Sequence, residues 1–130
     1  MTATPDNYAR DNAAAWLSII CEFVANHRAA VEDDAIDAAQ TAIHEAPLSV
    51  EVRSGWYRPC DANPEPLEYQ ILLATGGPAT RITGDLDTYG QPDTARLEYQ
   101  DWGTPWTARP LTAEEREDVL TFAQAFYYGD

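Results

Sequence analysis

Apolar and polar residues alternate along residues 67–73, which is the period of a β-strand with one buried face. The same alternation recurs at residues 48–53 and 95–100, and residues 81–86 return between them as the second strand of a hairpin. Glycine and proline interrupt the chain between the later stretches, in Gly76-Gly77-Pro78 and at Gly90 and Pro92, and such residues are typical of hairpin turns. The pattern therefore predicts a four-stranded antiparallel meander.

Spacings of three and four predict helices at both ends of the chain. A proline at position 5 favours a helix start, and the helix that continues to about Ala30 has an apolar stripe made of Trp16, Ile20, Phe23, Val24, His27 and Val31. A second helix begins at the acidic residues 32–34 and ends at Ala46-Pro47. The third begins with a capping box formed by Thr112 and Glu115, and its buried face consists of Val119, Phe122, Ala123 and Phe126.

The order of these elements, two helices, four strands and a last helix, predicts an α+β fold with the helices packed mainly on one face of the sheet. With 130 residues, of which 45% are hydrophobic, residues 1–130 suit a single domain that folds without disulfides or metal. Cys21 and Cys60 are expected to be free thiols. No apolar run reaches the roughly 20 residues that a membrane helix needs, so we expect a cytoplasmic protein without membrane contact.

The strongest compositional signal is negative charge. The chain has 22 acidic and 8 basic residues, which gives a formal net charge of −14. All 8 basic residues are arginines, because the sequence contains no lysine. Such a surface repels nucleic acid and anionic membranes and attracts basic partners. Direct binding to nucleic acid is therefore not expected.

The acids gather on two of the predicted helices. The candidate partner-binding residues are Glu32, Asp33, Asp34, Asp37 and Glu45 on the second helix, and Glu114, Glu117 and Asp118 on the last. One interpretation is that they form solvated helix faces, which is the usual role of such runs. The other is that two acidic ridges along one surface imitate the phosphate rows of a nucleic acid and occupy a basic groove on a protein.

Residues that could carry catalysis or bind a metal are sparse. His27 and His44 are the only histidines, and neither has a second metal ligand at helical spacing. Residues 85–90 begin like a calcium loop, but Arg96 stands where a bidentate glutamate is needed, so a hairpin turn explains them better. Because the sequence also lacks a nucleophile elbow and a phosphate-binding glycine motif, we expect no enzyme activity, no metal and no cofactor.

Aromatic residues in or next to loops give a second candidate site, formed by Trp56, Tyr57, Trp102 and Trp106. Such side chains are enriched at binding hot spots because they bury much area at a small entropic cost. They also serve as plugs at the end of a sheet. If two or more of them are exposed, they indicate a surface for a peptide or a small molecule.

The stretch ILLATGGPATRITGDLDTYGQPDTARLEYQDWGTPW, together with the short length and the acidity, resembles small proteins encoded by phages and prophages of proteobacteria. The resemblance covers residues 67–106 and the last helix. Phage proteins of this size and charge include anti-CRISPR and anti-restriction inhibitors, several of which imitate nucleic acid. The resemblance therefore implies an inhibitor of a host defence complex, and it assigns no functional residue.

Three hypotheses follow. The first is a stoichiometric inhibitor of the anti-CRISPR type, a monomer or homodimer, whose acidic surface binds the basic nucleic-acid-binding surface of a host complex in a salt-sensitive way. The second is a small-molecule or peptide binding module that has an aromatic pocket around Trp56, Trp102 and Trp106 and depends little on salt. The third is adaptation to a salty cytoplasm, which predicts acids spread evenly over the surface.

Overall fold

The computed structural model describes residues 5–60, 65–75, 77–101 and 104–128. Its elements, in chain order, are α1 (Pro5–Ala29), α2 (Asp33–Glu45), β1 (Ser49–Ser54), β2 (Pro66–Ala74), β3 (Ala79–Asp85), β4 (Arg96–Gln100), β5 (Thr107–Ala108) and α3 (Ala113–Ala123). Two helices at the start, a sheet and a final helix are the predicted order. The α+β class is therefore confirmed.

The strands form one antiparallel sheet in the order β1-β2-β3-β4-β5, so the meander has five strands rather than the four predicted. The additional strand, β5, pairs Thr107 with Tyr99 and Ala108 with Glu98. It is only two residues long and lies between Pro105 and Pro110. The other strands were predicted from alternating apolar and polar residues. A segment of two residues is too short to show that alternation, so β5 was not predicted.

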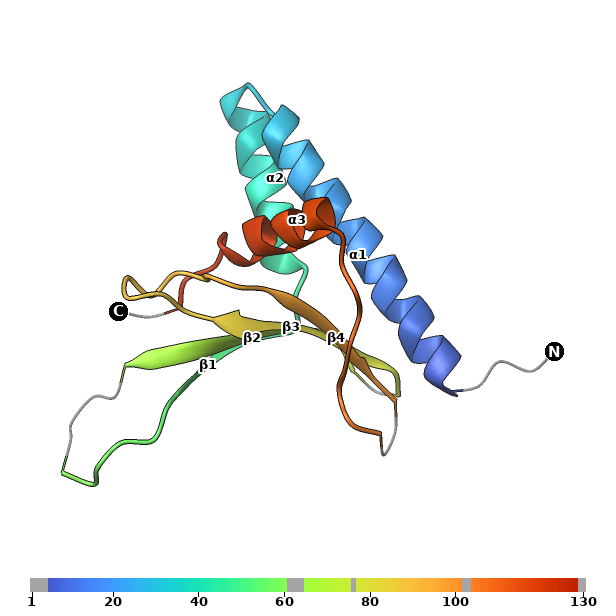
Figure 1. Ribbon diagram of the computed structural model, residues 1–130. Helices are drawn as coiled ribbons and strands as arrows, with labels where there is room; N and C mark the ends of the chain where they lie inside the picture. The colour runs from blue at the N-terminus through green and yellow to red at the C-terminus, as the bar shows by residue number, and fades with distance from the viewer. Residues whose placement is uncertain (1–4, 61–64, 76, 102–103, 129–130) are drawn as a thin grey trace.

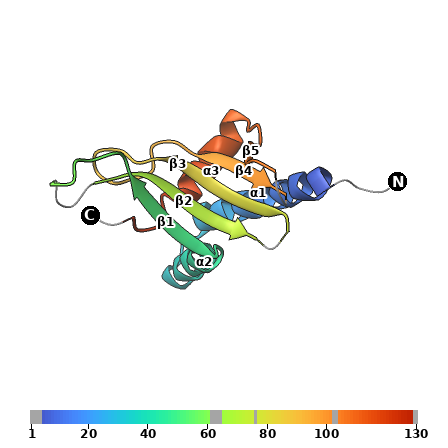
Figure 2. The same ribbon diagram turned by 90° about the horizontal axis from the view of Figure 1, so that it is seen from below.

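All three helices lie on one face of the sheet, as expected (Figure 1). The central helix of this layer is α1, which contacts β3, β4, α2 and α3. Seen from the sheet side, α2 and α3 flank α1 on opposite sides (Figure 2). The other face of the sheet, which we call the open face, is covered by no helix of the described residues (Figure 2). No helix in these parts of the chain is long and apolar enough to cross a membrane.

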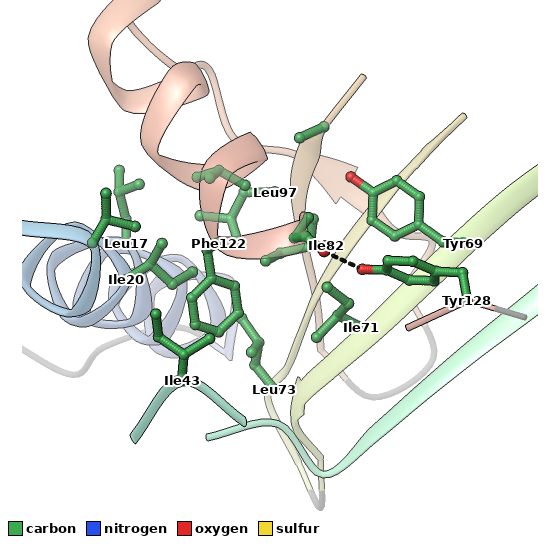
Figure 3. Packing of buried hydrophobic residues seen from close by; sticks show 14 of the residues in the cluster. Leu17, Ile20, Ile43, Tyr69, Ile71, Leu73, Ile82, Leu97, Phe122 and Tyr128 are labelled. Carbon is green, nitrogen blue, oxygen red and sulfur yellow. Dashed lines mark hydrogen bonds between the residues drawn. The ribbon is translucent and has the colours of Figure 1, made fainter. Parts of the chain in front are cut away.

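The core lies between the helical layer and the covered face of the sheet (Figure 3). Helix α1 contributes Leu17, Ile20 and Val24, which follow one another at helical spacing. Ile20 and Val24 belong to the predicted stripe, whereas Val31 lies beyond the end of α1 and is 86% exposed. The side chains that these residues meet include Ile43, Ile71, Ile82, Leu97 and Phe122. Burial of this one stripe fixes α1 on the sheet and leaves the flanks of α1 for α2 and α3.

Two buried tyrosines extend this core toward the C-terminal segment. The rings of Tyr69 and Tyr128 have their centroids 5.2 Å apart. The Tyr69 hydroxyl donates a hydrogen bond to the Thr94 carbonyl, and the Tyr128 hydroxyl donates one to the Ala123 carbonyl, both at 2.6 Å. Burial raises the pKa of both phenols above the ordinary value, so both remain protonated donors.

The local signals for a turn and a cap are confirmed. Between β3 and β4, the Asp87 carboxylate accepts hydrogen bonds from two backbone amides of the turn, at 2.8 and 3.0 Å, and Gly90 has a φ of 77°. This is the expected hairpin turn. At the start of α3, Thr112 Oγ1 accepts from the Glu115 amide at 3.1 Å, and Glu115 Oε1 accepts from the Thr112 amide at 2.9 Å.

Candidate functional site

The acidic residues of α2 lie on the side of that helix that faces solvent. Ile36, Ala39 and Ile43 form its inward edge, and Ile43 is buried in the core. Asp33 and Asp34 occupy the first turn, where the helix dipole favours carboxylates. All five acidic candidates of this helix are exposed, and we call them the acidic row of α2: Glu32, Asp33, Asp34, Asp37 and Glu45.

The acidic row has no neutralising base on its own helix. Residues 31–45 contain no arginine, and His44, the single histidine among them, uses Nε2 in a hydrogen bond with the Ala125 carbonyl at 2.8 Å. Within the described parts of the chain, no ion pair engages a carboxylate of the row. Asp33 and Glu45 are 12 positions apart, so at about 1.5 Å per residue the helical part of the row extends over ~18 Å. The row is therefore a strip of uncompensated negative charge.

Some of the acidic side chains of α3 already have partners within the protein. Glu114 and Glu117 are exposed. Asp118 accepts a hydrogen bond from Arg28 Nη1 at 3.0 Å and forms an ion pair that joins α1 to α3. Glu115 is engaged in the capping box. Among the candidate residues, α3 thus offers two unpaired carboxylates where α2 offers five.

The two acidic helices do not lie side by side. Because α1 occupies the middle of the helical layer, α2 and α3 are on its opposite flanks (Figure 2). The expected pair of ridges along one surface is therefore replaced by two separate strips, of which the strip on α2 is the more strongly charged.

Cys21 of α1 lies next to Asp118. Burial, and after it the hydrogen bond with Asp118 and the negative charge of that residue, raise the pKa of the Cys21 thiol to about 11. The thiol is therefore protonated at neutral pH and is a poor nucleophile. Cys60 is exposed, and both cysteines are free, as expected.

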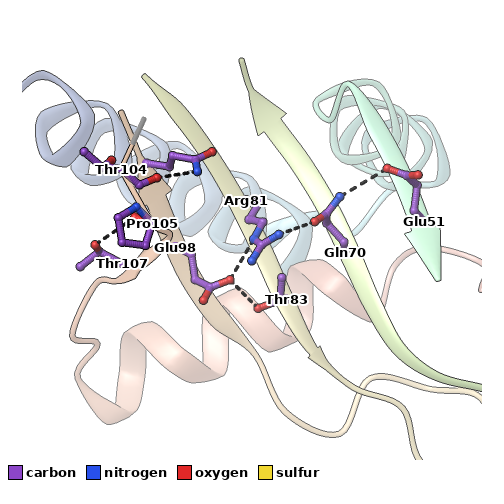
Figure 4. Close-up of polar contacts among 9 residues, drawn as sticks. Glu51, Gln70, Arg81, Thr83, Glu98, Thr104, Pro105 and Thr107 are labelled. Atoms are coloured by element: carbon purple, nitrogen blue, oxygen red, sulfur yellow. Dashed lines mark hydrogen bonds and ion pairs between the residues drawn. The ribbon is translucent and has the colours of Figure 1, made fainter. Parts of the chain in front are cut away.

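The open face of the sheet balances its charges internally. A cavity of ≈350 Å³ on this face is lined by three arginines and three glutamates, Arg53, Arg81, Arg96, Glu51, Glu68 and Glu98. Arg81 donates from Nε to Glu98 at 2.9 Å and from Nη1 to Gln70 at 2.7 Å (Figure 4). Arg53 forms an ion pair with Glu68 and lowers the pKa of that carboxyl. The arginines of the open face thus lie beside glutamates of the same face, whereas α2 has no arginine.

The aromatic candidates occupy different environments. Trp56 and Tyr57, in the connection between β1 and β2, have exposed fractions of 105% and 55%. Trp106 is half-buried, and its ring centroid lies 4.0 Å from the guanidinium carbon of Arg81. Trp102 lies outside the described residues. Trp106 is therefore part of the open face, while Trp56 and Tyr57 are presented to solvent.

The strand register separates Trp56 from Trp106. Trp56 follows the end of β1 that pairs with Pro66, whereas Trp106 precedes β5, which reaches the sheet at the Ala74 end of β2. Since β2 has 9 residues of about 3.3 Å each, its ends are ~26 Å apart. The expected common pocket around Trp56 and Trp106 is therefore not formed.

Two exposed apolar residues, one in β1 and one just before it, were not predicted from the sequence. Leu48 and Val52 are 60% and 43% exposed, although the alternation of this strand suggests a buried face. The first strand of a meander is always an edge strand, so its position in the chain was an available signal. Glu51 and Arg53 were a second signal, because charged side chains are common on edge strands.

The described residues hold no group of three or more histidine, cysteine, aspartate or glutamate side chains arranged for a metal ion. Comparison with known protein families, with curated proteins and with solved structures finds no match for this chain.

Proposed function

We propose that the protein is a stoichiometric inhibitor that uses the acidic row of α2 to occupy the basic nucleic-acid-binding surface of a host defence complex. The proposal extends the resemblance of the sequence to small acidic phage proteins, which include anti-CRISPR inhibitors. It requires no catalytic residue and no cofactor. The target is a protein, and the inhibitor itself does not bind nucleic acid.

One observation carries the proposal: the five carboxylates of the acidic row are all exposed, and none of them has an ion-pair partner in the described part of the chain. Clustered charge of one sign produces a local potential that steers a partner of opposite charge. A row of ~18 Å is comparable in length with about five nucleotides of a single DNA strand at 3.4 Å each. The row therefore suits a groove that tracks a phosphate backbone.

The distribution of arginine supports binding over adaptation to salt. Adaptation predicts acids spread evenly, whereas here Glu and Arg alternate on the open face and α2 has acids alone. The same chain thus contains a balanced surface and an unbalanced one. A general solubility role gives no reason for that difference.

The proposed mode of action is competition. The acidic row approaches the basic groove under long-range attraction and then excludes the nucleic acid from it by volume and charge. Glu114 and Glu117, on the other flank of α1, contribute to the attraction at a distance. Because Asp118 is paired with Arg28, it contributes less.

A displacement assay tests the proposal. Purified CRISPR effector complexes from several types are loaded with fluorescent target DNA, and release of the DNA is followed by anisotropy as the protein is added. Release at one equivalent of protein from at least one complex is expected. A protein that releases DNA from none of the complexes at any ratio contradicts the proposal.

Two matched variants assign the effect to α2. D33N/D34N/D37N removes three charges from the acidic row, and D11N/E22Q/D93N removes three exposed charges that belong to neither α2 nor α3. We expect the first variant to release DNA about tenfold less effectively and the second to change the effect much less. An equal loss in both would mean that net charge acts without a site on α2.

A second candidate function is favoured by the exposure of Trp56, whose side chain has 105% relative accessibility. In this alternative, the connection between β1 and β2 binds an apolar peptide or small molecule, and Tyr57 contributes to the same surface. Binding would then survive high salt and the loss of the acidic row. It would be lost in W56A, which leaves the displacement assay unaffected if the first proposal holds.

A further inference from the structure

Strand β1 is an exposed edge of the sheet. Among the strands of the described residues, β1 pairs only with β2, because the sheet order ends at β1. The opposite edge, β5, has 2 residues, whereas β1 has 6. A strand of this length at an edge has a row of backbone amides and carbonyls that are available for pairing with another strand.

The charged residues of β1, and the exposed apolar residues just outside its two ends, are placed symmetrically about Val52. One position away on either side are the opposite charges Glu51 and Arg53, which lie on the open face. Four positions away on either side are the exposed apolar residues Leu48 and Trp56. Val52 itself is 43% exposed. A strand with this symmetry is complementary to a reversed copy of itself.

We propose that two copies of this chain associate through β1, in antiparallel pairing about a two-fold axis at Val52. Each Glu51 then lies opposite Arg53 of the second copy, and the two Val52 side chains meet at the axis. The exposed residues Leu48 and Trp56 lie just outside the two ends of β1, so each Leu48 comes to the same end of the paired strands as Trp56 of the second copy. The two five-stranded sheets become one continuous sheet with a shared open face.

The charges on β1 select this register over its neighbours. Two-fold symmetric antiparallel pairing requires the axis to pass through a residue position. An axis at residue 51 places two glutamates opposite each other, and an axis at residue 53 does the same with two arginines. Like charges directly opposite on neighbouring strands are unfavourable, whereas opposite charges are favourable. Of the three axes at residues 51, 52 and 53, only the axis at Val52 avoids both conflicts, and it also places opposite charges together.

The present partners of these side chains leave them accessible. Arg53 forms an ion pair with Glu68, yet its side chain remains 79% exposed. Glu51 accepts a hydrogen bond from Gln70 at 3.3 Å and is exposed as well. Both contacts are made toward β2, on the inner side of β1. The outer side of the strand is therefore free to meet a second copy.

A charge swap measured by sedimentation velocity tests the proposal. The full chain is examined at increasing concentration in about 0.15 M salt, where the Debye length of about 8 Å screens the repulsion between two copies of net charge −14. E51R and R53E each create two pairs of like charge and are expected to raise the dimer dissociation constant about tenfold or more. The double variant E51R/R53E restores opposite charges across the interface and is expected to restore the dimer.

R96E is the matched control, because it makes the same charge change on the open face but on β4, away from the edge. It is expected to dimerise like the unmodified chain. Circular dichroism of each variant verifies that its fold is retained, and W56A gives a second measure that changes no charge. A chain that remains monomeric at ~1 mM overturns the proposal, as does failure of the double variant to recover when both single variants are monomeric.

Discussion

The guanidinium of Arg28 lies 3.0 Å from the carboxylate of Asp118, which joins the last turn of α1 to α3. The side chains of the two residues are 52% and 22% exposed, so solvent screens much of their attraction. Arg28 Nη2 also donates a hydrogen bond to Thr121 Oγ1, at 3.5 Å, on the next turn of α3. The pair orients two helices rather than forming a buried polar centre.

We therefore expect a modest stability effect from this pair. R28Q and D118N should each lower the free energy of unfolding by about 0.5–1 kcal/mol, and a double-mutant cycle should assign most of that loss to their interaction. Chemical denaturation at low and high salt measures it. A coupling energy that does not decrease at high salt would contradict the assignment of the pair as solvent-screened.

Two glycines give a matched test of close packing. A Cβ at Gly84 would lie 2.0 Å from the Thr94 carbonyl oxygen, which belongs to the backbone and cannot move aside easily. A Cβ at Gly55 would meet only the flexible end of Leu67, at 2.9 Å. We expect G84A to lower the free energy of unfolding by about 3 kcal/mol and G55A to change it little. Thermal denaturation of both variants is the measurement, and equal effects would show that β3 and β4 are not packed as described.

Arg109 has a buried Nε that has no hydrogen-bond partner among the residues that the structure describes. An unsatisfied buried donor is unfavourable, while the aliphatic part of the arginine contributes packing. R109M keeps a similar stem and removes the donor, so we expect it to raise the free energy of unfolding by about 1 kcal/mol. R109A removes the stem as well and should not stabilise. Denaturant midpoints of the two variants distinguish these outcomes, and a destabilised R109M would show that the guanidinium is needed.

Cys21 predicts a specific dependence of stability on pH. Its thiol pKa is raised to about 11 in the folded protein, so the unfolded chain, with a pKa near 9.0, loses this proton first. The contribution of the neutral thiol is complete below the unfolded pKa and is lost as the pH rises through the folded one. Between these two values, the stability of the unmodified protein should fall more steeply than that of C21A. Both proteins share Tyr69 and Tyr128, so the difference between their unfolding curves isolates Cys21.

The reactivity of the two thiols gives an independent measurement. Cys60 is exposed and should react quickly with a thiol reagent near neutral pH, whereas Cys21 is half-buried and its raised pKa keeps the thiol protonated, so Cys21 should react more slowly. Mass spectrometry after brief labelling reports the two sites separately. Labelling of both at the same rate would contradict the burial of Cys21.

The elements whose hydrophobic pattern repeats over many residues were predictable from the sequence. Ile20 and Val24 in α1, and Ile71 with its neighbours in β2, have spacings that only one type of element satisfies. The cap at Thr112 and the turn at Asp87 depend on side-chain hydrogen bonds to nearby amides, which are local and therefore visible in the sequence. Strand β5 was not visible, because tertiary pairing with β4 defines it.

The arrangement of the candidate surfaces was less predictable, because it depends on contacts between distant residues. The acids of α2 and α3 are recognisable in the sequence, but their separation by α1 follows from how three helices share one sheet face. The pairing of Asp118 with Arg28 spans 90 positions. Trp56 and Trp106 were predicted to share a pocket because both are aromatic residues near loops. The strand register shows that they lie at opposite ends of the sheet.

The most direct test of the proposed function is the salt dependence of binding to a complex from which the protein displaces DNA. The unmodified protein and D33N/D34N/D37N are compared by calorimetry at several salt concentrations. If the acidic row of α2 forms the contact, the affinity of the unmodified protein falls steeply with salt and that of the variant falls much less. Equal slopes for the two proteins, or an affinity that does not change with salt, would contradict it.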